Sequence, residues 1–248
     1  MNIGKTVGAL TIVASCWLPS LEGSAHKYLP DRTGPASTSE QEFAICLSGG
    51  STPRRLYHRL AGHAIASRFP WGRVQWFWGD ERFVPHDNPN SNYHMAYEAL
   101  FSRVPVPEDH IHPIPTEGLS PEQAAAHYQK LLQVYYGEER LAGNRPIFDV
   151  VLLGVGENGH TASLFPDRLA QREDRNWVLV VVGETPETRI TLNYPILESC
   201  RNLAFLVVGS NKKEILARIR GGDKATPAGR ICPLGNLYWF TARDAVPD

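Results

Sequence analysis

The chain contains 248 residues, of which 42% are hydrophobic and 21% are charged, and its formal net charge at pH 7 is −1. This composition is typical of a globular protein and excludes a disordered chain. The balanced charge gives no electrostatic reason to expect nucleic acid or a membrane surface as a partner. The cysteines contain no C-x-x-C pair, which indicates buried thiols of a reducing compartment rather than disulfides or a zinc site. They are Cys16, Cys46, Cys200 and Cys232.

The N-terminal segment, residues 1–42, is interpreted as irregular. Lys5 precedes an apolar stretch that ends in V-A-S-C at residues 13–16, a sequence similar to the cleavage box of a bacterial lipoprotein. The positive region is weak, and the apolar run is short and interrupted by hydroxyl side chains, so we expect a cytoplasmic protein rather than an exported one. No stretch is long and apolar enough to span a membrane.

From residue 43 onward, segments typical of strands alternate with segments typical of helices. Apolar runs predict strands at residues 43–47, 74–78, 148–153, 177–182, 189–192, 203–208 and 237–240. Helical spacing of apolar residues predicts helices at residues 53–69, 91–101, 121–136 and 211–219. Ser120 is placed to cap the third helix, and Pro121 suits its first position. This alternation predicts an α/β fold in which helices cover both faces of a mostly parallel sheet, and a single domain over residues 43–248.

The segment from Gly154 to Pro166 is the strongest indication of a functional site. It follows the strand predicted at residues 148–153 and reads G-V-G-E-N-G-H-T-A-S-L-F-P. Its first glycines allow a sharp turn and a close backbone approach to a ligand. His160 ends the turn at the carboxyl edge of the sheet, where α/β proteins bind ligands. Because an imidazole titrates near neutral pH, we predict His160 as a general base, the alternative being a histidine in a structural hydrogen bond.

The stretch L-S-G-G-S-T-P joins the first predicted strand to a helix. Gly49 and Gly50 allow a close approach, and Ser51 and Thr52 carry hydroxyl groups. The free N–H groups and the dipole at the start of a helix favour an anion or a cluster of sugar oxygens. No Gly-Lys-Ser/Thr follows, so this is not a Walker loop. The alternative is an ordinary turn between a strand and a helix.

Charged side chains lie at the ends of other predicted elements. Asp80, Glu81 and Arg82 come directly after an apolar strand, Arg189 opens a strand, and Lys212 begins a helix. An arginine fork suits a phosphate, and a carboxylate can orient the arginine or transfer protons. The alternative is that each is a solvated surface charge. The remaining histidines show no spacing typical of metal ligands, so no metal site is predicted.

Taken in order, these stretches resemble the glucosamine-6-phosphate isomerase/6-phosphogluconolactonase family, and within it the lactonases. The segments that carry the resemblance span about residues 43–240: L-S-G-G-S-T-P, G-D-E-R-F-V-P with S-N-Y, G-V-G-E-N-G-H-T-A-S-L-F-P, R-I-T-L and V-G-S-N-K. The resemblance implies a three-layer α/β/α fold with a mostly parallel sheet. It also implies hydrolysis of 6-phospho-D-glucono-1,5-lactone to 6-phospho-D-gluconate in the oxidative pentose phosphate pathway. The implied partner is this small phosphorylated lactone, no metal or organic cofactor is implied, and we expect a monomer.

The resemblance further implies roles for single residues. His160 is similar to the base that activates water for attack on the lactone carbonyl, with Asn158 beside it as a catalytic residue. Backbone donors around Gly49 and Gly50, or in the turn at residues 156–159, would stabilise the oxyanion. Arg82, Arg189 and Lys212 are the implied phosphate-holding or substrate-orienting charges. The full implied substrate-binding set is Gly49, Gly50, Ser51, Thr52, Asp80, Arg82, Gly159, Arg189 and Lys212.

Three positions depart from the pattern usual in the family. Asn158 and Thr241 each stand where an aspartate is usual, and Asp167 stands where glycine is common. An amide can orient the imidazole of His160 but cannot neutralise its charge. One alternative to a lactonase is therefore a catalytically weak sugar-phosphate binder. The other is a sugar-phosphate deaminase or isomerase, which is disfavoured because no glutamate follows in the stretch T-A-S-L-F-P.

Overall fold

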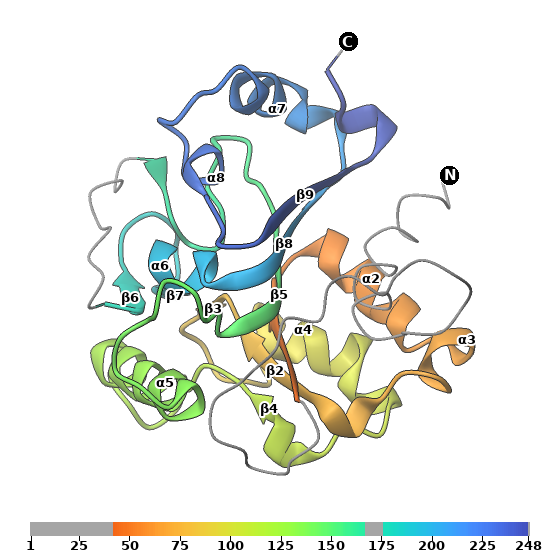
Figure 1. Cartoon of the computed structure of the whole chain (residues 1–248), viewed down its shortest axis with the longest axis vertical. Helices are drawn as coiled ribbons and strands as arrows, with labels where there is room; N and C mark the ends of the chain where they lie inside the picture. Colours follow the sequence, from red (N-terminus) through yellow and green to blue (C-terminus); the bar gives the residue numbers. More distant parts are fainter. Residues whose placement is uncertain (1–41, 167–175, 248) are drawn as a thin grey trace.

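The computed structural model describes residues 42–166 and 176–247, and the centre of this part of the chain is a six-stranded parallel sheet (Figure 1). The strands lie in the order β4-β2-β1-β5-β8-β9, and each neighbouring pair is parallel. The predicted mostly parallel sheet is therefore confirmed. The strands are β1 (Phe43–Leu47), β2 (Val74–Trp78), β4 (Ile111–His112), β5 (Phe148–Leu153), β8 (Cys200–Val207) and β9 (Asn236–Thr241).

The topology of this sheet fixes where a ligand site is expected. The chain extends the sheet from β1 towards β4 on one side and from β5 towards β9 on the other. Open α/β sheets bind ligands at the carboxyl ends of the strands that flank such a reversal. Every residue of β1 and β5 is buried, as is usual for strands of a parallel sheet covered on both faces. The loops after these two strands are the glycine-rich stretches that the sequence singled out.

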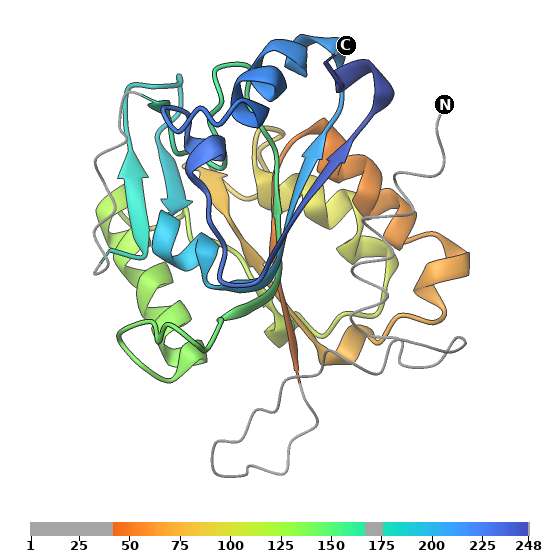
Figure 2. The same cartoon turned by 45° about the horizontal axis from the view of Figure 1, so that its top comes forward.

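Helices cover both faces of the sheet, which confirms the three layers (Figure 2). In this view α5 lies on one side of the sheet and α2, α3 and α4 lie on the other. The α-helices are α2 (Ser51–Leu60), α3 (His63–Ala66), α4 (Asn92–Ala99), α5 (Pro121–Tyr136), α6 (Tyr194–Glu198), α7 (Lys213–Arg220) and α8 (Pro227–Arg230). Short 3₁₀ helices are η1 (Trp71–Arg73), η2 (Phe101–Arg103), η3 (Glu108–His110), η5 (Ser210–Lys212) and η6 (Arg243–Ala245).

The helix boundaries follow local sequence. The capping of α5 is confirmed, because the hydroxyl of Ser120 accepts from the N–H of Gln123 while the side chain of Gln123 accepts from the N–H of Ser120. The single helix predicted over residues 53–69 is wrong. Gly62 takes an extended conformation, with φ −69° and ψ 139°, and divides this stretch into α2 and α3.

A second sheet of three antiparallel strands packs beside α5. It has the order β3-β7-β6 and consists of β3 (Asp80–Arg82), β7 (Arg189–Leu192) and β6 (Val178–Val181). The sequence predicted strands at the positions of β6 and β7, but it did not predict that they form a separate antiparallel sheet. Only residues 182–188 join them, whereas a parallel pair needs a crossover of about a dozen residues. Gly79 links the two sheets, since its N–H donates to Leu47 O of β1 at 2.9 Å and its carbonyl accepts from Leu192 N at 2.8 Å.

Two buried tyrosines hold the chain at the edge of the sheet that carries the glycine-rich loops. The hydroxyl of Tyr57 donates to the carbonyl of Ser48 at 2.7 Å and accepts from its N–H at 3.0 Å. Tyr128 makes the same pair of bonds with Trp78, at 3.2 Å and 2.9 Å. Helices α2 and α5 thereby fix the carboxyl ends of β1 and β2, from which the candidate site is built.

The buried thiols are partly confirmed. Cys46 and Cys200 are buried, whereas Cys232 is exposed in the loop before β9, and Cys16 lies outside the described residues. In the described part of the chain, no helix combines the length and apolarity needed to cross a membrane.

Candidate active site

The loop after β5 forms a tight turn that presents His160. The N–H of Gly156 donates to His160 O at 2.8 Å, and the N–H of Gly159 donates to Gly156 O at 3.0 Å. Gly159 has a φ of +83°, which favours glycine. A Cβ at this position would lie 2.6 Å from Thr226, so α8 packs directly on the turn. The sharp turn is present as predicted, and it places His160 at the carboxyl end of β5.

Asn158 fixes the tautomer of His160. Its Oδ1 lies 2.6 Å from Nδ1 of the imidazole and accepts a second hydrogen bond, of 3.1 Å, from the backbone N–H of His160. Because a backbone N–H can only donate, the Asn158 atom that faces both groups is the oxygen, and Nδ1 carries the ring proton. Nε2 therefore keeps its lone pair, which is the state that a general base requires.

The surroundings of His160 keep the imidazole neutral. Burial lowers its pKa from the usual 6.5, and the cations Lys212 and Arg189 lower the pKa further. The carboxylate of Asp80 acts in the opposite direction and raises it. The imidazole also packs against Phe165, with ring centroids 4.9 Å apart. At neutral pH the ring is therefore uncharged and able to accept a proton.

Gly156 provides the space for this imidazole, which leads to a testable prediction. A Cβ on Gly156 would lie 2.0 Å from Nδ1 of His160, so Gly156→Ala must displace the ring. We expect kcat for the reaction proposed below to fall by about 100-fold, since misplacement by roughly 1 Å has this effect. Gly154→Ala is the matched control in the same loop, because its Cβ would meet nothing within 4 Å. Equal loss in both variants, or none in Gly156→Ala, would contradict this account.

Asp80 and Glu81 are adjacent in sequence, but their carboxylates have different hydrogen-bond partners and different roles. The carboxylate of Asp80 accepts from Ser163 Oγ at 2.7 Å and from Asn92 Nδ2 at 3.3 Å, and its charge acts on His160. Glu81, only 1% exposed, accepts from the N–H groups of Asn92 and Tyr93 at the start of α4. Asp80 therefore belongs to the candidate site, whereas Glu81 caps a helix.

Arg82 and Arg189 form an unusual cross-strand pair. They lie directly opposite each other where β3 pairs with β7, an arrangement that destabilises a sheet when the charges are alike. Burial and the charge of Arg82 both lower the pKa of Arg189. Nε of Arg82 is buried without a hydrogen-bond partner among the described residues, and neither arginine forms an ion pair with a described carboxylate. Such a pair is well suited to an anion held between the two guanidinium groups.

A pocket of about 460 Å³ opens beside His160, a volume within the usual range for small-molecule sites. Lys212 reaches it from η5, and Arg189 is tied to its wall because its Nε donates to Thr185 Oγ1 at 3.1 Å. The described residues contain no cluster of side chains suited to a metal ion. The pocket is lined by Gly156, Glu157, Asn158, His160, Phe165, Glu184, Thr185 and Lys212.

The stretch from Gly49 to Thr52 lies at the start of α2, outside the pocket lining. A Cβ on Gly49 would lie 1.9 Å from Oδ1 of Asn92, the residue that donates to Asp80, so this loop packs against the candidate site. Gly50 has a φ of 100°, and no side chain of the described residues caps the helix. The first N–H groups of α2 are therefore available to an oxygen-rich ligand, as the sequence predicts.

Sequence reasoning missed three residues of the site. Ser163 and Asn92 hydrogen-bond to Asp80, and Thr185 joins Arg189 to the pocket wall. Ser163 and Asn92 lie inside motifs that the resemblance had already marked, but nothing local distinguishes their side chains. Their importance depends on contacts between distant parts of the chain.

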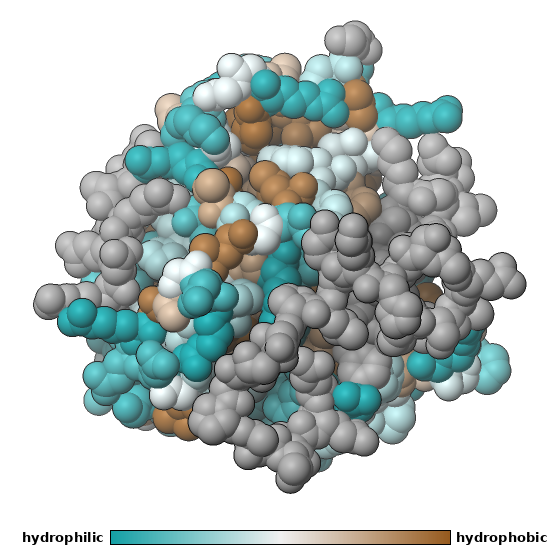
Figure 3. Space-filling model, in the orientation of Figure 1, coloured by the Kyte–Doolittle hydropathy of each residue, from teal (hydrophilic) through white to brown (hydrophobic). Residues whose placement is uncertain are grey.

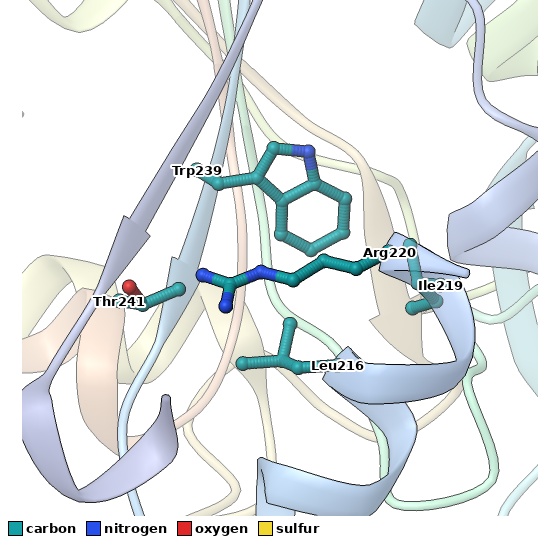
Figure 4. Close-up of a pocket in the computed structure, with 5 residues that line it drawn as sticks. All are labelled: Leu216, Ile219, Arg220, Trp239 and Thr241. Atoms are coloured by element: carbon teal, nitrogen blue, oxygen red, sulfur yellow. The ribbon is translucent and has the colours of Figure 1, made fainter. Parts of the chain in front are cut away.

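A second, smaller pocket lies between α7 and β9 and shares no lining residue with the first (Figure 4). Its volume is about 190 Å³, and Arg220 extends across it between Trp239 and Leu216. Apolar side chains gather over the same elements in the space-filling view (Figure 3). Thr241 lines this pocket, so the departure from the family pattern at this position does not touch the surroundings of His160. The departure at Asp167 lies outside the described residues.

Comparisons with known proteins show the family to which the chain belongs. The sequence profile of the family described as glucosamine-6-phosphate isomerases/6-phosphogluconolactonase matches residues 20–239. A 6-phosphogluconolactonase of Nostoc sp. is 41% identical over 210 residues, which cover 83% of this chain and 84% of that protein. The human 6-phosphogluconolactonase is 37% identical over 207 residues, which cover 80% of this chain and 77% of that protein.

Solved structures extend the similarity to three dimensions. The 6-phosphogluconolactonase of Thermotoga maritima matches with a TM-score of 0.68 at 30% identity, over 82% of this chain and 86% of that one. The enzyme from Trypanosoma brucei matches with a TM-score of 0.67 at 30% identity, over 82% and 84% of the two chains. A monomeric glucosamine-6-phosphate deaminase shares the fold at 19% identity, with a TM-score of 0.69 over 82% of this chain and 87% of that one. The chain thus belongs to the glucosamine-6-phosphate isomerase/6-phosphogluconolactonase family.

Proposed function

We propose that this protein hydrolyses 6-phospho-D-glucono-1,5-lactone to 6-phospho-D-gluconate, with His160 as the base that activates water. The observation that carries the proposal is the state of His160: Asn158 holds the proton on Nδ1, Nε2 has no hydrogen-bond partner among the described residues, and the residue lines a pocket. The names of the relatives from Nostoc and human support the same reaction. The test is to measure the rate at which freshly generated lactone is lost. The proposal expects a faster loss with the protein than in an enzyme-free control. A substrate of this kind is formed inside cells, which supports a cytoplasmic location.

The reaction follows from the free Nε2 atom. Nε2 removes a proton from water, and the resulting hydroxide oxygen forms a bond to C1 of the lactone. The tetrahedral oxyanion collapses, and the bond between C1 and the ring oxygen breaks. The imidazolium of His160 returns its proton to the departing ring oxygen, which becomes a hydroxyl group. The new carboxylic acid then releases its proton to water.

Lys212 is the group we assign to stabilise the oxyanion. Its ammonium lies on the pocket wall with His160, and its charge acts on the imidazole. The N–H groups of Gly156 and Gly159 donate within their own turn. Both backbone alternatives therefore stay open: the other two N–H groups of the turn at residues 156–159, and the donors around Gly49 and Gly50.

Arg82 and Arg189 are the groups we assign to the phosphate. A dianion between them would relieve the repulsion of the opposed guanidinium groups and give the buried Nε of Arg82 a partner. Ser51 and Thr52, with the first N–H groups of α2, remain available for other substrate oxygens. The charge of Asp80 acts on both His160 and Arg189, so this carboxylate affects the reacting end and the phosphate end of the site.

The amide of Asn158 predicts a specific response to Asn158→Asp. A carboxylate 2.6 Å from Nδ1 would favour the imidazolium and raise the pKa of His160. The base is active when neutral, so the acid limb of the pH profile of kcat/KM should move to higher pH. We also expect the plateau of kcat to rise several-fold, since the imidazolium formed in the transition state is better stabilised. An acid limb that stays in place or moves to lower pH would contradict this role of residue 158.

Two alternatives remain distinguishable in the same assays. A catalytically weak binder, suggested by the neutral Asn158, would bind 6-phosphogluconate without accelerating loss of the lactone. A deaminase would release ammonia from glucosamine 6-phosphate. The shared fold at 19% identity does not favour this second activity, because likeness of fold alone does not imply function.

A further inference from the structure

Ser163 joins the loop of His160 to the carboxylate of Asp80. Its Oγ donates to Oδ2 of Asp80 at 2.7 Å, across 83 positions of the sequence. Both residues are buried, with exposed fractions of 1% and 7%. A short hydrogen bond from a buried hydroxyl to a buried carboxylate is of the stronger, charge-assisted kind. It links the loop after β5, which carries His160, to β3 of the second sheet.

The backbone around Ser163 is shaped to hold this hydroxyl in place. Thr161 and Leu164 bridge across a tight turn, with Ala162 and Ser163 at its centre. Ala162 is the one described residue other than glycine with a positive φ, of 48°, a conformation that costs energy and is typical of functional sites. The N–H of Ser163 donates to Oγ1 of Thr191 at 3.2 Å, and Thr191 is the register partner of Asp80. Backbone and side chain of Ser163 are therefore both anchored to the second sheet.

The tether matters because Asp80 lies among competing charges. The charged side chains that act on His160 come from three elements: Asp80 of β3, Arg189 of β7 and Lys212 of η5. The two cations oppose formation of an imidazolium, and Asp80 is the anion that favours it. Arg189 also attracts Asp80, so an untethered carboxylate could rotate towards the guanidinium. If Asp80 turned away, the neutral Asn158 could not replace its negative charge beside the imidazolium of His160.

We propose that Ser163 is a positioning residue for the reaction: its hydroxyl holds the Asp80 carboxylate where the negative charge favours the imidazolium of His160. The inference rests on the proposed role of His160. It goes beyond that role by assigning the electrostatic stabilisation of the imidazolium to Asp80, held in position by Ser163. Ser163 touches neither the water nor the substrate. It acts only through Asp80.

The experiment measures the pKa of His160 directly, by NMR titration of its ring signals in the intact protein. Ser163→Ala should lower this pKa by about half a unit to one unit, because the Asp80 carboxylate turns away from His160 when it loses the hydroxyl that holds it. Asp80→Asn should lower it at least as much. The double variant should match Asp80→Asn alone, since Ser163 acts through Asp80. In the lactonase assay, kcat of Ser163→Ala should fall about 10-fold and its acid limb should move to lower pH.

Ser199→Ala is the matched control for loss of a buried serine. Ser199 is 2% exposed, and its Oγ accepts from Ile147 N at 3.2 Å. It directly precedes β8, at the amino end of that strand, and does not line the pocket. The substitution should leave the pKa of His160 and kcat unchanged. An unchanged or raised pKa in Ser163→Ala, or a further fall in the double variant, would overturn the proposal. The titration needs no turnover, so a protein without lactonase activity would refute the proposed function and still test the role of Ser163.

Discussion

Replacing His160 with alanine is expected to lower kcat for 6-phosphogluconolactone by about 1,000-fold while KM changes little. Nε2 of His160 is the proton acceptor placed at the pocket with its lone pair free. Lys212, Arg82 and Arg189 remain in the variant, so the substrate should still bind. The measurement is the initial rate of lactone loss over a range of substrate concentrations, with the spontaneous rate subtracted.

The control for this variant is His127→Ala. His127 is exposed on α5, outside the pocket lining, so its replacement should leave both kcat and KM unchanged. The thermal unfolding midpoint of His160→Ala should stay within a few degrees of the unsubstituted protein, because its ring is only partly buried. A folded His160→Ala that retains most of its activity would show that another group activates the water.

Replacing either arginine of the opposed pair is expected to raise KM by roughly 10- to 100-fold, with a smaller effect on kcat. Arg82 and Arg189 lie opposite each other, and in the described part of the chain no carboxylate pairs with either one. Each guanidinium that is lost removes charge-assisted hydrogen bonds to the phosphate. Loss of the Arg82 charge should not destabilise the unliganded fold, because Arg82→Ala removes the repulsion between the guanidinium groups of Arg82 and Arg189.

The comparison that isolates the phosphate uses D-glucono-1,5-lactone, which lacks it. Arg82→Ala and Arg189→Ala should differ little from the unsubstituted protein on this substrate, and inorganic phosphate should raise the unfolding midpoint of the unsubstituted protein more than that of either variant. Arg55→Ala serves as the control, since Arg55 is exposed on α2. Equal losses of activity on the phosphorylated and the unphosphorylated lactone would indicate that the arginines act at the lactone carbonyl and not at the phosphate.

The sequence predicted five of the six strands of the parallel sheet from their own apolar pattern and missed β4, which has only two residues. Strands β1 and β5 are short apolar runs buried throughout, and their pattern does not depend on which neighbour they pair with. The second sheet could not be predicted in this way. Its strand β3 is the charged triplet Asp80–Arg82, whose strand character comes only from pairing with β7 more than a hundred positions later. A charged triplet alone has no strand pattern.

The candidate site likewise has features that local sequence can predict and features that depend on contacts between distant residues. A glycine-rich turn that ends in His160 can be recognised locally, because glycine positions and a titratable side chain are visible in a dozen residues. Which carboxylate of the adjacent pair faces the site could not be decided locally. The structure decides it, since Glu81 is occupied by the N–H groups at the start of α4 while Asp80 meets Ser163.

The central claim is that this member of the family is a lactone hydrolase. The most direct measurement follows two reactions of the purified protein side by side: loss of freshly generated 6-phosphogluconolactone, and release of ammonia from glucosamine 6-phosphate. We expect lactone loss far above the enzyme-free rate, an enzymatic rate about 1,000-fold lower in His160→Ala, and no release of ammonia. Lactone loss at the spontaneous rate, or ammonia release that depends on His160, would contradict the account.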